Sequence, residues 1–309
     1  MKKRQLGKDG PNVPVIGLGT FPFSGSMGNV TDERSFRVIQ RALDLGMTFI
    51  DTAEGYGRGR SETIIGRAMK NKRDKVFLAT KVFGRPLNRQ RIENAIHSSL
   101  LRLGTDYIDL YQIHWPDPST PVEESIRVLD DLIRAGKVRH AGVSNFDVPL
   151  LKRAVSVRQI ASNQMPYSLL DRQIENEVMP FCKENGIAII PYSPLGKGLL
   201  TGKFNQKTSF PTTDARSRMN GFQTQDYESN LDVAKGIQTM AEEKGVRPSQ
   251  IAIAWTLQRE EVASCIPGAT QPVQCDENAG AADITFTQKE LTFLDDLSEG
   301  APGGTEVRF

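Results

Sequence analysis

Short apolar runs alternate with amphipathic helical patterns along almost the whole chain, and this alternation restricts the possible folds more than any other feature. Eight runs have the character of strands: VPVIGLGT, TFIDTA, KVFLATKV, YIDLYQIHW, RHAGVSN, QIASNQ, IAIIPYS and VASCIPG. They are largely continuous apolar stretches, which is typical of parallel strands covered on both faces. Eight strands, each followed by a helical segment, predict an α/β fold: one (β/α)8 TIM barrel forming a single domain over residues 1–309.

The segments between the strands carry helix signals. Residues 88–104 and 120–136 place apolar side chains on one face and end at glycine, the usual left-handed stop. Thr120 is the expected N-cap of the second of these helices. Two extra helices are expected near 229–245 and 287–299, outside the regular alternation. The opening segment is expected to form a small hairpin that closes the bottom of the barrel.

One interval breaks the alternation. Residues 198–228 are long, polar and irregular, and a loop of this length within a compact domain is typically a lid or a binding loop.

Composition excludes several classes of partner. The chain has 39 basic and 37 acidic residues, so it lacks the strong positive charge typical of nucleic-acid or anionic-membrane binding. The basic N-terminus is followed by no apolar segment of a secretory signal, and no apolar stretch approaches the roughly 18 residues of a transmembrane helix. Three cysteines without a CxxC pair favour reduced thiols in a cytoplasmic protein.

Chemically active side chains stand where the expected strands end. In a barrel, these carboxyl ends face a shared pocket. Asp51 ends the second strand, Lys81 the third and His114 the fourth, while Tyr56 lies in the loop after the second. The other ends carry Gly19, Thr20, Phe21, Ser144, Asn145, Asn163, Gln164, Tyr192, Ser193 and Gly268.

Each of these residues has an ordinary structural interpretation when taken alone. Asp51 and Glu54 have the spacing of a capping box, Lys81 could extend along a strand end to water, and His114 could be a buried core residue. Together, however, they place a carboxylate, a phenol, an ammonium and an imidazole around one mouth. This combination favours a catalytic site.

The chemistry that suits this set is proton donation to a carbonyl oxygen. A phenol with a pKa near 10 is a weak acid at neutral pH, and a nearby buried ammonium is expected to lower that pKa. The ammonium needs a carboxylate to keep its charge, so Asp51, Lys81 and Tyr56 form a coherent chain, and His114 can orient the carbonyl. No side chain can deliver hydride, so a nicotinamide cofactor is implied. No cluster of histidines and cysteines suggests a metal site.

Several motifs, in order, give the chain a family resemblance: GLGT, FIDTAEGYG, LATKV, YQIHWPDP, GVSNF, NQMPYS, PYSPLGKGLLTGKF and IPGATQPVQCDEN. Over nearly its whole length the chain resembles the aldo-keto reductases, in particular the bacterial members that reduce carbonyl compounds generally. The resemblance implies a barrel that binds NAD(P)H in extended form and reduces aldehydes or ketones reversibly. It also implies Tyr56 as the general acid, tuned by Lys81 and Asp51, with His114 positioning the carbonyl.

The resemblance further implies the cofactor contacts. Those around the nicotinamide are Ser144, Asn145, Gln164 and Tyr192, and four more cofactor contacts are expected: Gly19, Thr20, Phe21 and Asp51. Those along the pyrophosphate and adenosine are Ser193, Leu195, Gly196, Lys197, Gly268, Gln274, Glu277 and Asn278.

At the adenosine end the chain departs from the family pattern. Many members have Lys or Arg at positions equivalent to 268–274, where they bind the 2′-phosphate of NADPH, but GATQPVQ contains no cation. Arg216 or Arg218 could substitute from the long loop. NADPH is the expected cofactor, and NADH is not excluded.

A second hypothesis comes from a different functional class: a cofactor-binding regulatory or accessory subunit with slow residual reductase activity. The expected substrate is a small carbonyl compound, with pocket walls from residues 21–30, 83–88, 115–119 and 198–228. Neither the substrate nor the oligomeric state can be inferred from these segments.

Overall fold

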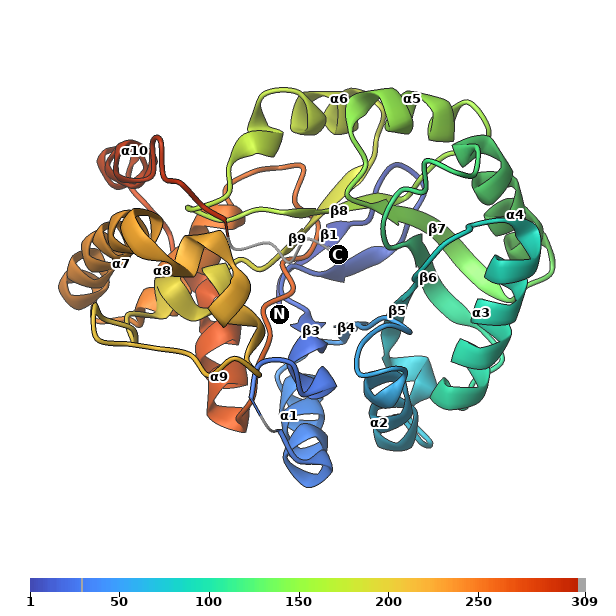
Figure 1. Cartoon of the computed structure of the whole chain (residues 1–309), viewed down its shortest axis with the longest axis horizontal. Helices are drawn as coiled ribbons and strands as arrows, with labels where there is room; N and C mark the ends of the chain where they lie inside the picture. Colours follow the sequence, from blue (N-terminus) through green and yellow to red (C-terminus); the bar gives the residue numbers. More distant parts are fainter. Residues whose placement is uncertain (29, 305–309) are drawn as a thin grey trace.

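The computed structural model describes residues 1–28 and 30–304, and its centre is a curved parallel sheet surrounded by helices (Figure 1). Seven strands pair in the order in which they occur in the sequence. They are β3 (Leu18–Gly19), β4 (Phe49–Asp51), β5 (Phe77–Val82), β6 (Ile108–Ile113), β7 (Val138–Ser144), β8 (Ser162–Pro166) and β9 (Ala188–Tyr192). This sequential parallel order is that of the predicted barrel.

The eighth segment closes the barrel through isolated bridges instead of a regular strand. Parallel bridges join Cys265 to Ile16, Gly268 to Gly19, and Val262 to Ile189, so the segment contacts both edges of the sheet. The expectation of a regular eighth strand is therefore wrong. Pro267 has no N–H to donate, which removes one possible ladder bond from this short segment.

Ten α-helices are assigned in the described part of the chain. They are α1 (Asp32–Asp44), α2 (Arg60–Ala68), α3 (Arg89–Leu103), α4 (Val122–Arg134), α5 (Val148–Val155), α6 (Val178–Glu184), α7 (Thr224–Lys244), α8 (Pro248–Thr256), α9 (Pro272–Gly280) and α10 (Gln288–Leu297). The two extra helices that the sequence predicts correspond to α7 and α10, which lie together beside α8 (Figure 1). None of the helices in the described residues has both the length and the apolar character needed to cross a bilayer.

Local signals set both ends of α3 but not the start of α4. In α3 the Asn88 side chain accepts a hydrogen bond from the backbone N–H of Arg91, and Gly104 ends the helix in the left-handed conformation. In α4 the N-cap is Pro121, so the prediction of Thr120 is wrong. The Thr120 hydroxyl donates to Asp117 at 2.7 Å, and this contact takes it away from the helix end.

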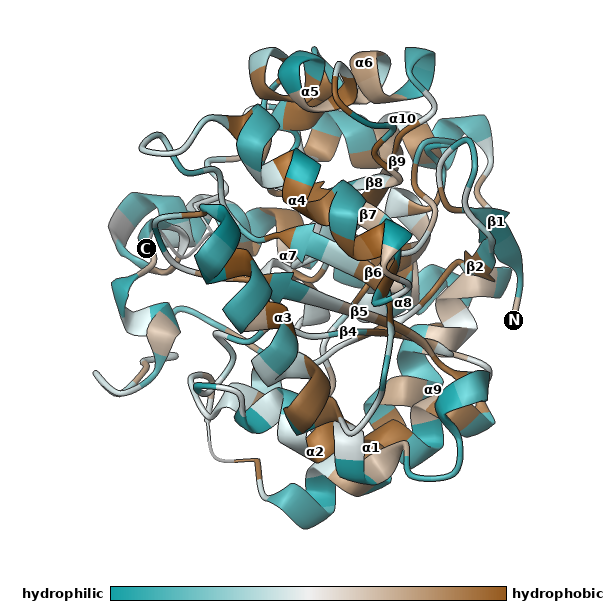
Figure 2. Ribbon diagram, turned by 90° about the vertical axis from the view of Figure 1, so that its right-hand side faces the viewer, coloured by the Kyte–Doolittle hydropathy of each residue, from teal (hydrophilic) through white to brown (hydrophobic). Residues whose placement is uncertain are grey.

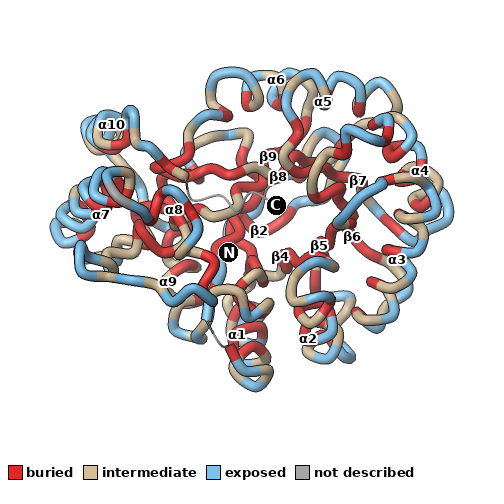
Figure 3. Tube along the Cα trace, viewed as in Figure 1, coloured by how far each residue is buried: buried red, intermediate tan, exposed pale blue. Residues whose placement is uncertain are grey.

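The core has two layers, inside and outside the sheet. Inside the barrel, Phe49, Leu110 and Ile190 pack with Leu6 and Val13 from the N-terminal segment. These last two belong to or adjoin the predicted hairpin, β1 (Lys3–Gln5) with β2 (Asn12–Pro14). The outer layer joins the strands to the helices. Hydrophobic residues are concentrated along the strands (Figure 2), and the strands are buried while the outer helix faces are exposed (Figure 3).

The interval 198–228 is irregular as far as residue 223, and its last five residues belong to α7, so the predicted end of the loop is too late. The irregular part holds the end of the short 3-10 helix η4 (Gly196–Thr201) and the 3-10 helices η5 (Ala215–Arg218) and η6 (Asn220–Phe222). The backbone N–H of Ala215 donates to the carbonyl of Ser26 at 3.0 Å. The interval is thereby tied to the loop that follows β3.

Candidate active site

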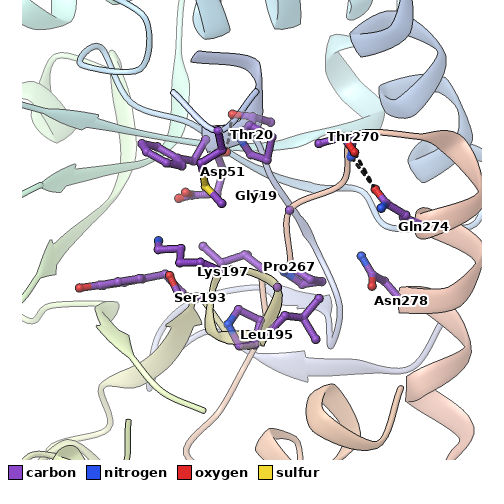
Figure 4. A pocket seen from close by; sticks show the side chains of 18 of the residues that line it. Gly19, Thr20, Asp51, Ser193, Leu195, Lys197, Pro267, Thr270, Gln274 and Asn278 are labelled. Carbon is purple, nitrogen blue, oxygen red and sulfur yellow. Dashed lines mark hydrogen bonds between the residues drawn. The ribbon is translucent and has the colours of Figure 1, made fainter. Parts of the chain in front are cut away.

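A cavity of about 460 Å³ opens among the carboxyl ends of the strands and extends to α8 and α9 (Figure 4). It collects most of the side chains that the sequence selects. Those that line it are Gly19, Thr20, Phe21, Asp51, Tyr56, His114, Ser144, Asn145, Gln164, Tyr192, Ser193, Leu195, Lys197, Arg216, Gly268, Gln274, Glu277 and Asn278. Four of the residues named in the sequence analysis are outside the lining: Lys81, Asn163, Gly196 and Arg218.

Lys81 lies directly behind the cavity wall. Its side chain is fully buried, and its Nζ donates to Asp51 Oδ1 at 2.6 Å and to the carbonyl of Thr52 at 2.8 Å. The same Nζ is 3.5 Å from the hydroxyl of Tyr56. A buried ammonium is stable only when it is paired and hydrogen-bonded, and the end of β4 provides both interactions.

The second oxygen of Asp51 is also satisfied. Oδ2 accepts from Gln164 Nε2 at 2.9 Å and from Gln112 Nε2 at 3.3 Å. Gln112 was not selected from the sequence, although it lies on β6 two residues before His114, which directly follows that strand. Side chains two apart on a strand share a face. This periodicity could have identified it.

The electrostatics of the pair differ from the sequence expectation in one respect. Burial alone would lower the pKa of Lys81, but Asp51 and Tyr56 raise it by more than burial lowers it. The net shift is upward, so the ammonium stays charged. Burial raises the pKa of Tyr56, and the nearby Lys81 offsets only part of that rise. The expected fall of the Tyr56 pKa below its ordinary value is therefore not seen. The phenol keeps its proton and can donate it.

His114 faces the cavity between two aromatic rings. Its ring centroid lies 5.7 Å from that of Tyr56 and 5.4 Å from that of Phe83, both in edge-on geometry. Burial, reinforced by the charge of Lys81, holds the His114 pKa well below 6.5, so the imidazole is neutral. Its Nδ1 is buried with no hydrogen-bond partner among the described residues. The ring is thus suited to bind a ligand atom, such as a carbonyl oxygen.

The strand ends β7–β9 form a hydrogen-bonded wall. Tyr192 OH donates to Asn145 Oδ1 at 2.9 Å, and Asn145 Nδ2 donates to Ser144 Oγ and to the carbonyl of His114, each at 3.0 Å. Ser144 Oγ in turn donates to the carbonyl of Gln164 at 2.8 Å. These bonds fix the polar side chains that the family resemblance assigns to the nicotinamide.

The wall continues into a strained turn. Ser193 and Lys197 both adopt positive φ, at 54° and 53°, which costs non-glycine residues of the order of 1–3 kcal/mol each. Gly196 turns within this segment, where its N–H donates to the carbonyl of Ser193 at 2.9 Å. Strain of this kind persists at binding sites, where the surrounding structure enforces it.

The far end of the cavity carries the adenosine residues of the prediction. Gln274 Oε1 accepts from Thr270 N at 2.7 Å, from Thr270 Oγ1 at 3.1 Å and from Gln271 N at 3.2 Å (Figure 4). Asn278 is 2% exposed, and its Nδ2 has no hydrogen-bond partner within the described chain. A buried, unpartnered amide on a cavity wall fits a bound polar ligand.

The cations at this end differ from those expected. Arg216 lines the cavity, but its guanidinium binds Asp214, with Nε at 2.9 Å and Nη2 at 2.6 Å from the two carboxylate oxygens. Arg218 is exposed, and the structure does not bring it to the lining. Lys203 and Arg247 line the cavity and were missed. No sequence pattern around either residue indicates a binding role. Lys203 reaches the cavity from the loop after η4, and Arg247 from the start of α8.

Comparisons with known proteins agree with this geometry. The family model described as "Aldo/keto reductase family" matches residues 15–299. Aldo-keto reductase YhdN of Bacillus subtilis is 38% identical over 321 residues, covering 99% of this chain and 97% of that protein. The structure of a glycerol dehydrogenase from Gluconobacter oxydans superposes with a TM-score of 0.88 at 34% identity, covering 99% of this chain and 98% of the other.

A further structure concerns the cofactor. An aldo-keto reductase from Klebsiella pneumoniae in complex with NADPH has a TM-score of 0.79 at 30% identity, covering 98% of this chain and 96% of the other. The resemblance noted in the sequence motifs is thus confirmed over nearly the whole chain. The chain belongs to the aldo/keto reductase family, and it is an NAD(P)H-dependent oxidoreductase.

Proposed function

We propose that this reductase converts small aldehydes and ketones to alcohols with Tyr56 as the proton donor. The observation that carries the proposal is the convergence of three groups at one end of the cavity. The Tyr56 hydroxyl is 3.5 Å from the Lys81 ammonium, and the Tyr56 ring packs edge-on against the neutral His114. A carbonyl oxygen there would meet a phenolic donor and an imidazole. Proton donation by a positioned side chain typically contributes about 10²–10⁴-fold to the rate.

Each residue has a distinct task in this proposal. Tyr56 transfers its proton to the carbonyl oxygen as that oxygen gains negative charge. Lys81 then stabilises the phenolate that remains, since an adjacent ammonium favours the charged form. Asp51 keeps Lys81 protonated through their 2.6 Å contact. His114, neutral because of burial, accepts or donates a hydrogen bond without adding charge and orients the carbonyl.

The residues around the cavity fit a nicotinamide dinucleotide, which supplies the hydride when bound. Asn278 Nδ2 is a buried donor without a partner, and Ser193 Oγ is likewise buried without one among the described residues. Ser144, Asn145 and Gln164 would hold the nicotinamide, and Tyr192 would lie beneath its ring. Phe21 would lie near it.

The cofactor that we propose is NADPH, with NADH accepted as well. Three cations line the cavity and can pair with an extra phosphate: Lys203, Arg216, which is bound to Asp214, and Arg247, which lies 3.8 Å from Glu277. The relative from Klebsiella pneumoniae was solved with NADPH. Against a strong preference, residues 268–274 hold no cation, and the donors at the start of α9 are already bound to Gln274.

The substrate end of the cavity is mainly apolar. Phe21, Met27 and Trp115 line it beside Tyr56 and His114. An apolar wall with one polar end suits a carbonyl compound with an aliphatic or aromatic body. Buried, unpaired cysteines and a near-neutral charge are in keeping with a cytoplasmic enzyme that acts on small molecules and not on nucleic acids.

The decisive experiment is the Tyr56→Phe variant with a reactive aldehyde. It should bind NADPH as the wild type does, measured by quenching of protein fluorescence, while kcat falls about 10²–10⁴-fold. Unchanged turnover would refute Tyr56 as the donor. An inactive wild type that still binds NADPH would instead favour the accessory-subunit hypothesis.

A further inference from the structure

The loop that carries Tyr56 is joined to the end of β5 by one acidic side chain. The backbone N–H of Glu54 donates to the carbonyl of Lys81 at 3.3 Å. Its carboxylate oxygen Oε1 accepts from the backbone N–H of Phe83 at 2.6 Å. Glu54 therefore bonds to the residue that supplies the ammonium and to the residue that packs on His114, and it lies two positions before Tyr56.

An arginine on α3 completes this connection. Arg91 Nη2 lies 2.5 Å from Glu54 Oε1, and the same nitrogen donates to the carbonyl of Phe83. The side chains are 12% exposed for Glu54 and 31% exposed for Arg91, so the pair is only partly screened by water. Charge-assisted hydrogen bonds of this kind are shorter and stronger than neutral ones.

Phe83 passes the restraint on to the site. Its ring lies edge-on to His114 at 5.4 Å. The ring also lies so close to Gly55 that a Cβ at position 55 would be 3.2 Å from it. The imidazole of His114 has a buried Nδ1 without a hydrogen-bond partner among the described residues, so neighbouring rings set its orientation. A shift of Phe83 would leave His114 poorly directed.

The local sequence has a simpler interpretation that does not hold. Asp51 and Glu54 have capping-box spacing, but α2 begins at Arg60 with Gly59 as its N-cap. Glu54 serves no helix end. Its carboxylate instead accepts a 2.6 Å hydrogen bond from the backbone N–H of Phe83, 29 positions away.

We propose that Glu54 and Arg91 are positioning residues, a clamp that holds the Tyr56 loop and Phe83 in register so that the phenol, the ammonium and His114 meet at one carbonyl. Neither residue is in the lining of the cavity, so the clamp acts through Tyr56 and Phe83. The proposal rests on the proposed function of Tyr56 and extends it to residues that the sequence motifs left unassigned.

The test compares clamp variants with a matched control on the same helix. Glu54→Ala and Arg91→Ala remove the contacts, while Glu54→Gln and Arg91→Lys keep part of the hydrogen bonding. Arg89→Ala is the control, because Arg89 also lies on α3 and pairs with carboxylates, Glu93 and Asp131, but its side chain is 51% exposed.

The clamp predicts a loss in kcat alone. In Glu54→Ala and Arg91→Ala, kcat should fall about 10–100-fold, since small misplacements of catalytic groups have effects of this size. The Kd for NADPH, measured by fluorescence titration, should stay within about twofold, and the two conservative variants should recover part of kcat. Arg89→Ala should match the wild type in both quantities.

Two results would overturn the clamp. One is a kcat close to wild type in both alanine variants. The other is a parallel loss of NADPH binding and kcat, which would mark general support of the fold. Tyr56→Phe in the same assay separates the two proposals. If it retains turnover, the assignment of the proton donor fails. If it is inactive while the clamp variants are active, only the clamp fails.

Discussion

Removing the buried ammonium is the sharpest test of the charge arrangement at the site. In Lys81→Met, a side chain of similar length loses its charge, and Asp51, which is 2% exposed, loses its 2.6 Å partner. Removing one member of a buried ion pair costs about 3–5 kcal/mol of stability, because an uncompensated charge stays buried. We expect a value near the lower end of this range, since Gln112 and Gln164 still donate to Asp51 Oδ2.

The turnover number should fall together with the stability. Without Lys81 the phenolate of Tyr56 loses its nearest positive charge, so kcat should drop about 10²–10⁴-fold. The double variant Lys81→Met/Asp51→Asn removes both charges and should regain much of the stability but none of the activity. Lys183→Met, which breaks contacts of a lysine 60% exposed, should leave the free energy of unfolding almost unchanged.

Urea unfolding followed by circular dichroism gives the free energies, and aldehyde-dependent oxidation of NADPH gives kcat. The reasoning fails if Lys81→Met is as stable as the wild type, because the ammonium would then not compensate Asp51. It also fails if the double variant is no more stable than Lys81→Met, since the cost would then come from lost packing. Retained turnover in Lys81→Met would show that Tyr56 works without the charge.

Three further predictions concern the cofactor, pH and the thiols. Gln274→Arg should free the backbone donors at the start of α9 and add a cation. The ratio of kcat/KM for NADPH to kcat/KM for NADH should then rise about tenfold or more. An unchanged ratio would mean that the 2′-phosphate binds elsewhere. His114 has a folded-state pKa well below 6.5, so its contribution to stability is full above about pH 6.5 and is lost as the pH falls. The variant His114→Gln should therefore show a shallower fall of the unfolding free energy at acid pH than the wild type. An equally steep fall would contradict this. Burial raises the pKa of Cys182, Cys265 and Cys275 to about 12, so a thiol reagent should label none of them in the native protein at pH 8 and all of them in urea; rapid native labelling would contradict the burial.

The sequence predicts the barrel and its catalytic end because both depend on local patterns. The second, third and fourth apolar runs carry a polar residue near their ends, and parallel strands bring such ends to one edge, so Asp51, Lys81 and His114 could be grouped without coordinates. Helix ends that depend on one neighbour were also predictable. Asn88, the first residue of the predicted range 88–104, caps α3, whereas the predicted cap Thr120 donates its hydroxyl to Asp117 instead.

The pKa of a buried group was harder to predict from the sequence. The sequence suggests that Lys81 lowers the pKa of Tyr56, and the charge does act in that direction. Its effect is exceeded by desolvation, whose size depends on how much protein surrounds the phenol. No spacing of residues along the chain encodes that amount.

Hydrogen bonds between segments far apart in the sequence were also not predictable from local pattern. Gln164 donates to Asp51 from 113 positions away, and Gln112 from 61. Strand-end position identifies Gln164 as facing the mouth, but not that its amide serves a carboxylate. Glu54 shows the same limit more strongly, because its spacing from Asp51 fits a capping box while the partners of its side chain lie just after β5 and on α3. Local pattern therefore identifies which groups reach the mouth, and the long-range hydrogen bonds determine what each one can do there. The residues whose local rule is broken, Glu54 among them, are the ones where positioning of the catalytic groups should be sought.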